Sequence, residues 1–80
     1  MEREEIKRKV IECIRAVSCY DLEGISEESQ LDGPDIAFDT LDTFEFLVEV
    51  ENEFDVEISN SQADGCTTVG DVIDLVESLL

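Results

Sequence analysis

The chain has 80 residues, of which 42% are hydrophobic, and its 22 acidic and 5 basic side chains give a formal net charge of −17. Every cation lies at or before Arg15, so the remainder would repel nucleic acid and anionic membranes and would attract basic protein surfaces. The length suits a single domain, residues 1–80, and the hydrophobic content with its periodicity argues against a disordered acidic chain.

The first predicted helix runs from about Glu2 to Val17, with one apolar stripe at Ile6, Val10, Ile14 and Val17. Residues 21–38 then form a long connection with turn residues at Gly24, Gly33 and Pro34. A loop of this length in a compact domain usually has a function or packing of its own. We expect it to be anchored by its apolar residues, which are Leu22, Ile25, Leu31 and Ile36.

A second helix is expected from just after its N-cap, Asp39, to Phe54 or Asp55. One face carries Phe46, Val50 and Phe54, and a second apolar stripe carries Leu41, Phe44 and Val48. A chain this short has little left to cover a second stripe. The stripe is therefore either an exposed docking surface rimmed by charge or a second buried side of the helix, and the pattern alone does not distinguish them.

A short helical turn is expected near Ser59–Asp64, ending at Gly65. A last helix should begin after Thr67 or Thr68, because Thr68 and Asp71 have the spacing of a capping box. Its apolar stripe follows at Val69, Val72, Ile73, Val76, Leu79 and Leu80. The expected fold is an all-α four-helix bundle with three main helices, one short helix and a long first loop.

Several kinds of chemistry are excluded by residues that are missing. The chain has no histidine, which rules out Ser–His and Cys–His nucleophile pairs, and it has no glycine-rich phosphate loop. The cysteines have no CxxC spacing, so we interpret them as reduced thiols and not as a disulfide framework or a zinc site: Cys13, Cys19 and Cys66. We expect no catalytic site, no metal and no membrane insertion, and a cytoplasmic location.

The segment Phe38-Asp39-Thr40-Leu41-Asp42 resembles the acyl carrier protein motif, in which Asp-Ser-Leu-Asp opens the second helix. The resemblance continues through residues 51–58, with the family's Phe-Asp-x-x-Ile, and through the Thr-Val that begins the last helix. It implies an acidic, monomeric four-helix carrier that is not an enzyme. Such a carrier holds acyl intermediates as thioesters on a 4′-phosphopantetheine arm and presents them to enzymes of fatty acid, lipid or polyketide synthesis.

The resemblance also assigns roles to positions of this chain. It places the 4′-phosphopantetheine attachment at Thr40. The implied partners are a phosphopantetheinyl transferase and acyl-processing enzymes with basic patches, docking on Asp39, Leu41, Asp42, Phe44, Glu45, Val48, Glu51 and Glu53. The acyl chain would lie among residues that also suit an ordinary core, namely Phe46, Val50, Ile58, Cys66 and Val72.

Two departures from the family bear on function. Ala37 stands where the family usually has glycine, and Thr40 replaces the attachment serine. Threonine keeps a hydroxyl but adds a β-methyl group that stiffens the side chain and crowds the nucleophile. Three interpretations stay open: a tolerant transferase modifies Thr40, the substitution was made to keep the protein unmodified, or the chain is a carrier-like paralogue that acts only as an acidic docking module.

Overall fold

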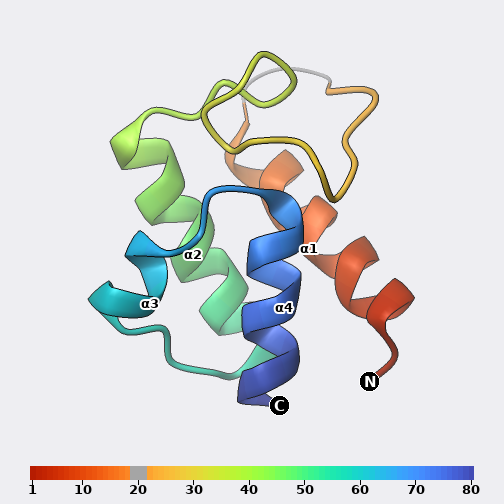
Figure 1. Cartoon of the computed structure of the whole chain (residues 1–80), viewed down its shortest axis with the longest axis vertical. Coiled ribbons are helices and arrows are strands. Elements are labelled where there is room, and N and C mark those ends of the chain that lie inside the picture. The colour runs from red at the N-terminus through yellow and green to blue at the C-terminus, as the bar shows by residue number, and fades with distance from the viewer. Residues whose placement is uncertain (19–21) are drawn as a thin grey trace.

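The computed structural model describes residues 1–18 and 22–80, and they form four helices. These are α1 (Arg3–Val17), α2 (Thr40–Phe54), α3 (Asn60–Asp64) and α4 (Val69–Leu79). The predicted all-α bundle is therefore confirmed, including its short third helix. Three long helices pack together, and the loop of residues 22–39 lies across one end of them (Figure 1). Cys19 and the start of the predicted connection lie outside the described residues.

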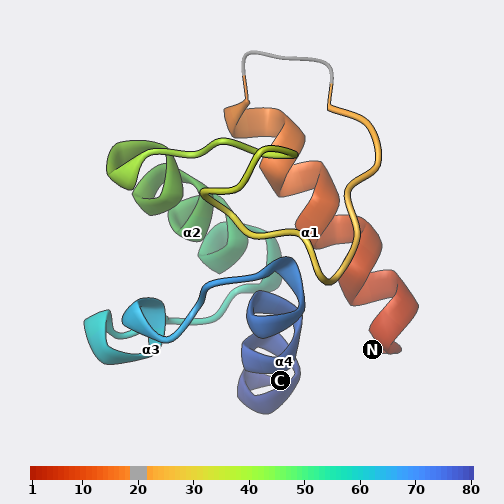
Figure 2. The same cartoon turned by 45° about the horizontal axis from the view of Figure 1, so that its top comes forward.

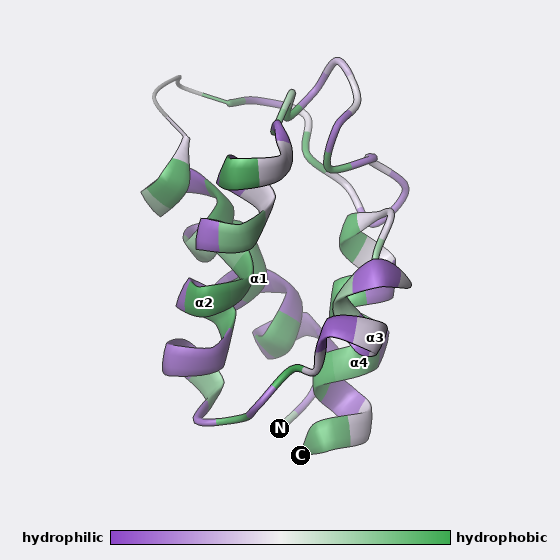
Figure 3. Ribbon diagram, turned by 90° about the vertical axis from the view of Figure 1, so that its left-hand side faces the viewer, coloured by the Kyte–Doolittle hydropathy of each residue, from purple (hydrophilic) through white to green (hydrophobic). Residues whose placement is uncertain are grey.

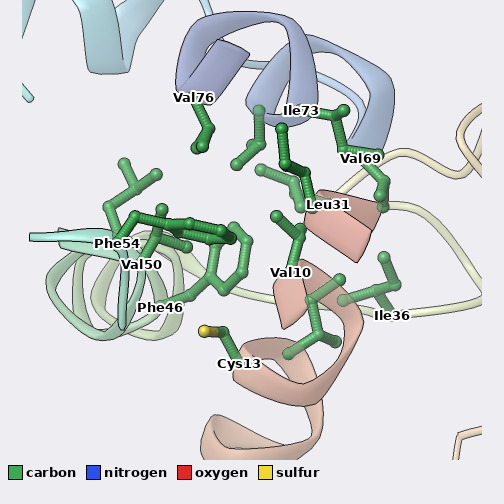
Figure 4. Packing of buried hydrophobic residues seen from close by; sticks show 14 of the residues in the cluster. Val10, Cys13, Leu31, Ile36, Phe46, Val50, Phe54, Val69, Ile73 and Val76 are labelled. Atoms are coloured by element: carbon green, nitrogen blue, oxygen red, sulfur yellow. The ribbon is translucent and has the colours of Figure 1, made fainter. Parts of the chain in front are cut away.

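The helices meet in one hydrophobic core (Figure 4). α1 packs against both α2 and α4, because its apolar stripe is buried between them. Facing it are Phe46, Leu47, Val50 and Phe54 of α2 and Val69, Val72, Ile73 and Val76 of α4. Fully burying a side chain of this size contributes about 1.5–3 kcal/mol. No helix in the described part of the chain is long and apolar enough to cross a membrane.

Capping boxes fix where the last three helices begin. In each, the N-cap side chain accepts a backbone N–H from the third helical residue, whose side chain accepts the N-cap N–H in return. The pairs are Asp39 with Asp42, Ser59 with Gln62, and Thr68 with Asp71. The last of these was predicted and is confirmed. Local sequence thus sets the start of α2, and with it the position of Thr40.

Backbone hydrogen bonds attach the first loop to the start of α4. They run from Leu31 N to Thr67 O (3.0 Å), from Val69 N to Ser29 O (3.0 Å) and from Gly70 N to Glu27 O (2.8 Å). The first N–H groups of a helix have no partner within it, so the loop carbonyls satisfy donors that α4 leaves free. Figure 2 shows the loop passing over α1 towards this end of α4 before it returns to α2.

The predicted apolar anchors of the loop are confirmed. Leu31 and Ile36 are buried, and Leu22 and Ile25 pack partly buried against the same core. Ser29 is also buried, and its hydroxyl donates to the Asp35 carboxylate at 3.2 Å. The long loop is therefore a packed element of the fold.

Arg3 links the start of α1 to two other parts of the chain. Its guanidinium donates to Glu27 in the loop, and to Asp74 (2.8 Å) and Glu77 in α4. The hydrogen bond from Arg3 lowers the pKa of Glu27, and the same bond is the main reason that the pKa of Arg3 is raised. Because these groups are partly exposed to solvent, each pair alone contributes little to stability.

The close approach of loop and helix predicts the effect of Gly70→Ala. A Cβ atom at position 70 would lie 3.0 Å from the Glu27 carbonyl oxygen, so the loop backbone at Glu27 must give way by a few tenths of an ångström. We expect a loss of about 1 kcal/mol, at the lower end of the usual cost of overpacking. Urea denaturation measures it as a lower midpoint at unchanged slope. The control is Gly65→Ala, whose Cβ would meet only the Gln62 carbonyl oxygen at 3.5 Å; an equal loss there would contradict the prediction.

Asp71 predicts a pH-dependent contribution to stability. Its carboxylate accepts the backbone N–H groups of Thr68 and Thr67, both at 3.0 Å, and these bonds lower the pKa of Asp71. A carboxyl group whose pKa is lowered on folding stabilises the protein above its unfolded pKa of about 4, and loses that contribution as the pH falls through the folded value. Asp71→Asn should therefore be less stable than the parent at neutral pH by less than about 1 kcal/mol. Thermal melts should show the difference closing below about pH 4, and a difference independent of pH would contradict the assignment.

Candidate functional site

Thr40 is the first residue of α2, and its side chain is exposed. The neighbouring polar groups are already engaged: Asp42 N donates to Asp39 Oδ1 at 2.8 Å, and Thr43 Oγ1 donates to the Asp39 carbonyl oxygen at 2.9 Å. Among the hydrogen bonds between described residues, none uses the Thr40 hydroxyl. Of the two threonines in the first turn, Thr40 therefore offers the hydroxyl that is free to react.

Thr40 stands on the wall of an open groove of about 590 Å³. Its floor is apolar and formed by Leu31, Phe38, Leu47, Ala63 and Cys66. Around it lie Asp32, Asp39, Thr43, Phe44, Asn60, Asp64 and Thr67. The groove thus runs between the end of the first loop, the start of α2, and α3 with the segment after it. Its volume is in the range of small-molecule sites, about 300–1,000 Å³.

The backbone before Thr40 adopts an unusual conformation. Ala37 has φ 57°, in the left-handed region that favours glycine, and its N–H donates to the Gly33 carbonyl oxygen at 2.7 Å. The next residue, Phe38, donates its N–H to the Leu31 carbonyl oxygen at 2.9 Å. Position 37 is the one at which the sequence has alanine in place of the family's usual glycine. The left-handed conformation is strained for alanine, so this replacement lowers the stability of the folded state.

The second apolar stripe of α2 is exposed, which decides the alternative that the pattern left open. Leu41 and Phe44 each keep 64% of their surface accessible and Val48 keeps 37%. Seen from the side of α2 and α3, apolar and polar residues alternate along α2 (Figure 3). The expected acidic docking residues Asp39 and Glu45 are also exposed, and Asp42 is half-buried in the capping box.

Besides Asp39 and Asp42 in the capping box, two more of the expected docking carboxylates make contacts within the chain. Glu51 accepts the backbone N–H of Ile58 at 2.8 Å and so holds the connection that follows α2. Glu53 lies 3.7 Å from the Lys9 ammonium group and faces α1. Glu51 and Glu53 therefore have structural partners, whereas the side chains of Leu41, Phe44, Glu45 and Val48 are exposed.

The residues expected to surround an acyl chain do not line one hollow. Phe46, Val50 and Val72 have no exposed surface and belong to the core, and Ile58 packs partly buried against it. Of this set, Cys66 alone lies on the groove. In this structure Phe46, Val50 and Val72 are packed as core residues, which the resemblance also allowed for them, and the open groove lies beside Cys66.

The described thiols are poor nucleophiles at neutral pH. Burial, aided by the charge of Glu53, raises the pKa of Cys13 to about 11. Burial is also the main reason that the pKa of Cys66 is raised, with Asp71 adding to it. Cys13 and Cys66 are both free, and the described residues contain no cluster of potential metal ligands. For these two cysteines the interpretation as reduced, hydrophobe-like residues is consistent with the structure.

Sequence reasoning missed most of the groove floor. Leu47 follows Phe46 and belongs to the buried side of α2, which an i, i+3, i+4 count from Val50 and Phe54 could have found. Phe38 and Leu31 could not be found in that way, because the loop carries no helical period. Ala63 and Cys66 reach the groove only through the position of α3.

The chain matches known proteins over almost its whole length. Residues 8–76 match the family model described as "Phosphopantetheine attachment site". The chain is 37% identical to the acyl carrier protein of Chlorobium phaeobacteroides over 95% of this chain and 96% of that one. It is 33% identical to the mitochondrial acyl carrier protein of Saccharomyces cerevisiae over 98% of this chain and 65% of that one. Its fold is similar to the structure of the acyl carrier protein from Enterococcus faecalis, with TM-score 0.77, 30% identity and full coverage of both chains.

The left-handed conformation of Ala37 predicts that Ala37→Gly stabilises the protein. An L-residue in this region costs about 1–2 kcal/mol, and glycine removes that strain from the folded state. Glycine also gives the unfolded chain more conformational freedom, which cancels part of the stabilisation. We expect a net gain of about 0.5–1 kcal/mol. Chemical denaturation measures it, with Ala37→Val as the matched control that should be destabilised. A loss of stability in the glycine variant would show that position 37 is not strained.

Proposed function

The chain belongs to the acyl carrier protein family, and we propose that it carries its 4′-phosphopantetheine arm on the Thr40 hydroxyl. Its function is that of an acyl carrier, and it is not an enzyme. One observation supports the assignment above all: Thr40 presents an exposed hydroxyl without a hydrogen-bond partner among the described residues, beside an open groove. When bound, the arm supplies a thiol on which acyl groups are held as thioesters.

The residues around Thr40 fit such a group. The hydroxyl belongs to the first turn of α2, where helix N–H groups and the helix dipole favour a phosphodiester. Asp39 and Asp42 oppose it with their charge, but each is held in the capping box. A covalent ester does not need a closed phosphate pocket. The chain has to hold the hydroxyl in a fixed place and keep it accessible, and the capped helix does both.

The exposed side of α2 is the proposed docking surface. Leu41, Phe44 and Val48 offer apolar area, and Asp39 and Glu45 give its surroundings negative charge. Partners with basic patches would be steered to such a surface and held by the apolar contacts. The proposed partners are a phosphopantetheinyl transferase and acyl-processing enzymes of fatty acid, lipid or polyketide synthesis. We propose a monomeric, cytoplasmic carrier, although one similar protein is mitochondrial.

The β-methyl group of Thr40 supports a second candidate. A transferase whose site is shaped around serine can lose much of its rate when the nucleophile is displaced slightly. The chain would then act as an acidic docking module without cargo, through the same exposed face of α2.

Intact mass spectrometry distinguishes the two candidates. The protein is incubated with coenzyme A, magnesium and a promiscuous phosphopantetheinyl transferase. We expect a gain of one phosphopantetheine in the parent, a faster gain in Thr40→Ser and none in Thr40→Ala. Thr43→Ala is the matched control and should still gain the group, because the Thr43 hydroxyl is bonded to Asp39. A gain in Thr40→Ser with none in the parent would favour the docking module.

A further inference from the structure

Arg3 is the one cation in the described part of the chain that has ion pairs with two other elements, the first loop and α4. We propose that these ion pairs control a local opening in which residues 27–31 detach from the start of α4 while the three long helices stay packed. The inference concerns the unmodified protein, so it does not depend on the attachment of any group at Thr40.

The charges around Arg3 are unbalanced. Its guanidinium donates to Glu27 of the loop and to Asp74 (2.8 Å) and Glu77 of α4, and we call these four residues the Arg3 cluster. One positive charge thus faces three negative ones. The charge of Asp74 already acts against that of Glu27, because it raises the pKa of Glu27 while Arg3 lowers it. Lys7 assists Arg3 in lowering this pKa but forms no ion pair with Glu27 in the described residues. Without Arg3, the loop and α4 would therefore repel each other here.

Glu27 is held to α4 at two points. Its carboxylate accepts from Arg3, and its carbonyl oxygen accepts the Gly70 N–H at 2.8 Å. The loop comes so close to α4 that a Cβ atom at position 70 would lie 3.0 Å from that oxygen. The other two backbone hydrogen bonds between the loop and α4 involve Ser29 and Leu31, directly after Glu27. The Arg3 cluster therefore lies at one end of the series of bonds that must break when the loop detaches.

Residues 27–31 are held less firmly than the helices are. The long helices share a core of buried side chains, whereas this segment contributes only Leu31 as a buried apolar residue. Its other buried residue, Ser29, bonds through its hydroxyl to Ser26 and Asp35 within the loop, so these bonds need not break on detachment. Segments with few buried apolar contacts open at a lower free energy than the core does. The segment can thus open before the bundle unfolds.

The chain can turn next to this segment. Gly24 has φ 75°, and no atom lies within 4 Å of the place where its Cβ would be, so its backbone angles are free to change. Leu31 lines the groove beside Thr40. Opening would therefore change one wall of the groove while the capped start of α2 stays in place.

Amide hydrogen exchange followed by NMR observes this opening. The N–H groups of Leu31, Val69 and Gly70 donate across the contact between the loop and α4, so we call them the contact amides. The N–H of Val50, in the middle of α2, reports opening of the bundle itself. At low ionic strength, the contact amides should be less protected from exchange than Val50 is.

Arg3→Gln removes the positive charge from the cluster. The contact amides should then exchange about three- to tenfold faster, since several exposed ion pairs of modest strength are lost together. Arg8→Gln is the matched control: it removes the same charge from the same helix, but its ion pair, with Glu12 at 3.2 Å, lies within α1. It should change the exchange of the contact amides less than about twofold. Arg3→Lys keeps the charge without the forked donor and should restore protection in part. Added sodium chloride should narrow the difference between the parent and Arg3→Gln.

Glu27→Gln tests the cluster from the side of the loop. In the parent it removes the partner of Arg3, so the contact amides should exchange faster. In the Arg3→Gln background it removes the repulsion from Asp74 and Glu77, so the same substitution should slow their exchange. A change of sign of this kind identifies an interaction between charges, which a loss of packing would not produce. If Arg3→Gln is poorly folded, Glu27→Gln and Arg3→Lys still report on the cluster in the folded protein.

Two results would overturn the inference. Equal effects of Arg3→Gln and Arg8→Gln on the contact amides would show that only the net charge matters. Contact amides that are protected as strongly as Val50, and that change with it in every variant, would show that the loop does not open separately from the bundle.

Discussion

The backbone hydrogen bonds between residues 27–31 and residues 67–70 hold the first loop against α4, and the geometry of the site depends on them. They place Leu31 beside the segment that carries Cys66, and the Leu31 carbonyl oxygen in turn accepts the N–H of Phe38, two residues before α2 begins. The apolar residues of the loop then cover the end of the core that lies next to the loop. Without this attachment the groove would lose one wall, and the start of α2 would keep its cap but lose its fixed place.

The charge of the chain makes such attachments important. Repulsion among the acidic side chains of a small domain with a net charge of −17 favours expansion, while a core of this size provides only modest stability. The few cations are used against that repulsion at places where elements meet. Arg3 joins α1, the loop and α4, and Lys9 lies near Glu53 of α2. The face of α2 that carries Leu41 and Phe44 receives no cation in the described residues, so its negative field stays available to partners.

The predictable parts of the fold are those determined by residues close together in the sequence. Capping residues and apolar periods set the four helices to within a residue or two, and the resemblance pointed to Thr40 and to the exposed stripe of α2. The groove was not predictable. Its floor is formed by residues of the loop, α2, α3 and the segment after α3, and the tertiary contacts that bring them together leave no periodic pattern in the sequence. Phe46, Val50 and Val72 suit a core and a cargo-binding cavity alike, because both kinds of residue share one pattern in sequence, and in this structure all three are buried in the core.

The two ends of the chain lie close together at the end of the bundle opposite to the first loop and to the start of α2 (Figure 1). The contacts of Arg3 with Asp74 and Glu77 join them there. Any peptide extending from either end would leave the molecule far from the Thr40 hydroxyl. The domain could therefore be tethered within a larger polypeptide, or immobilised on a surface through a tag, while its cargo end turned freely towards successive enzymes.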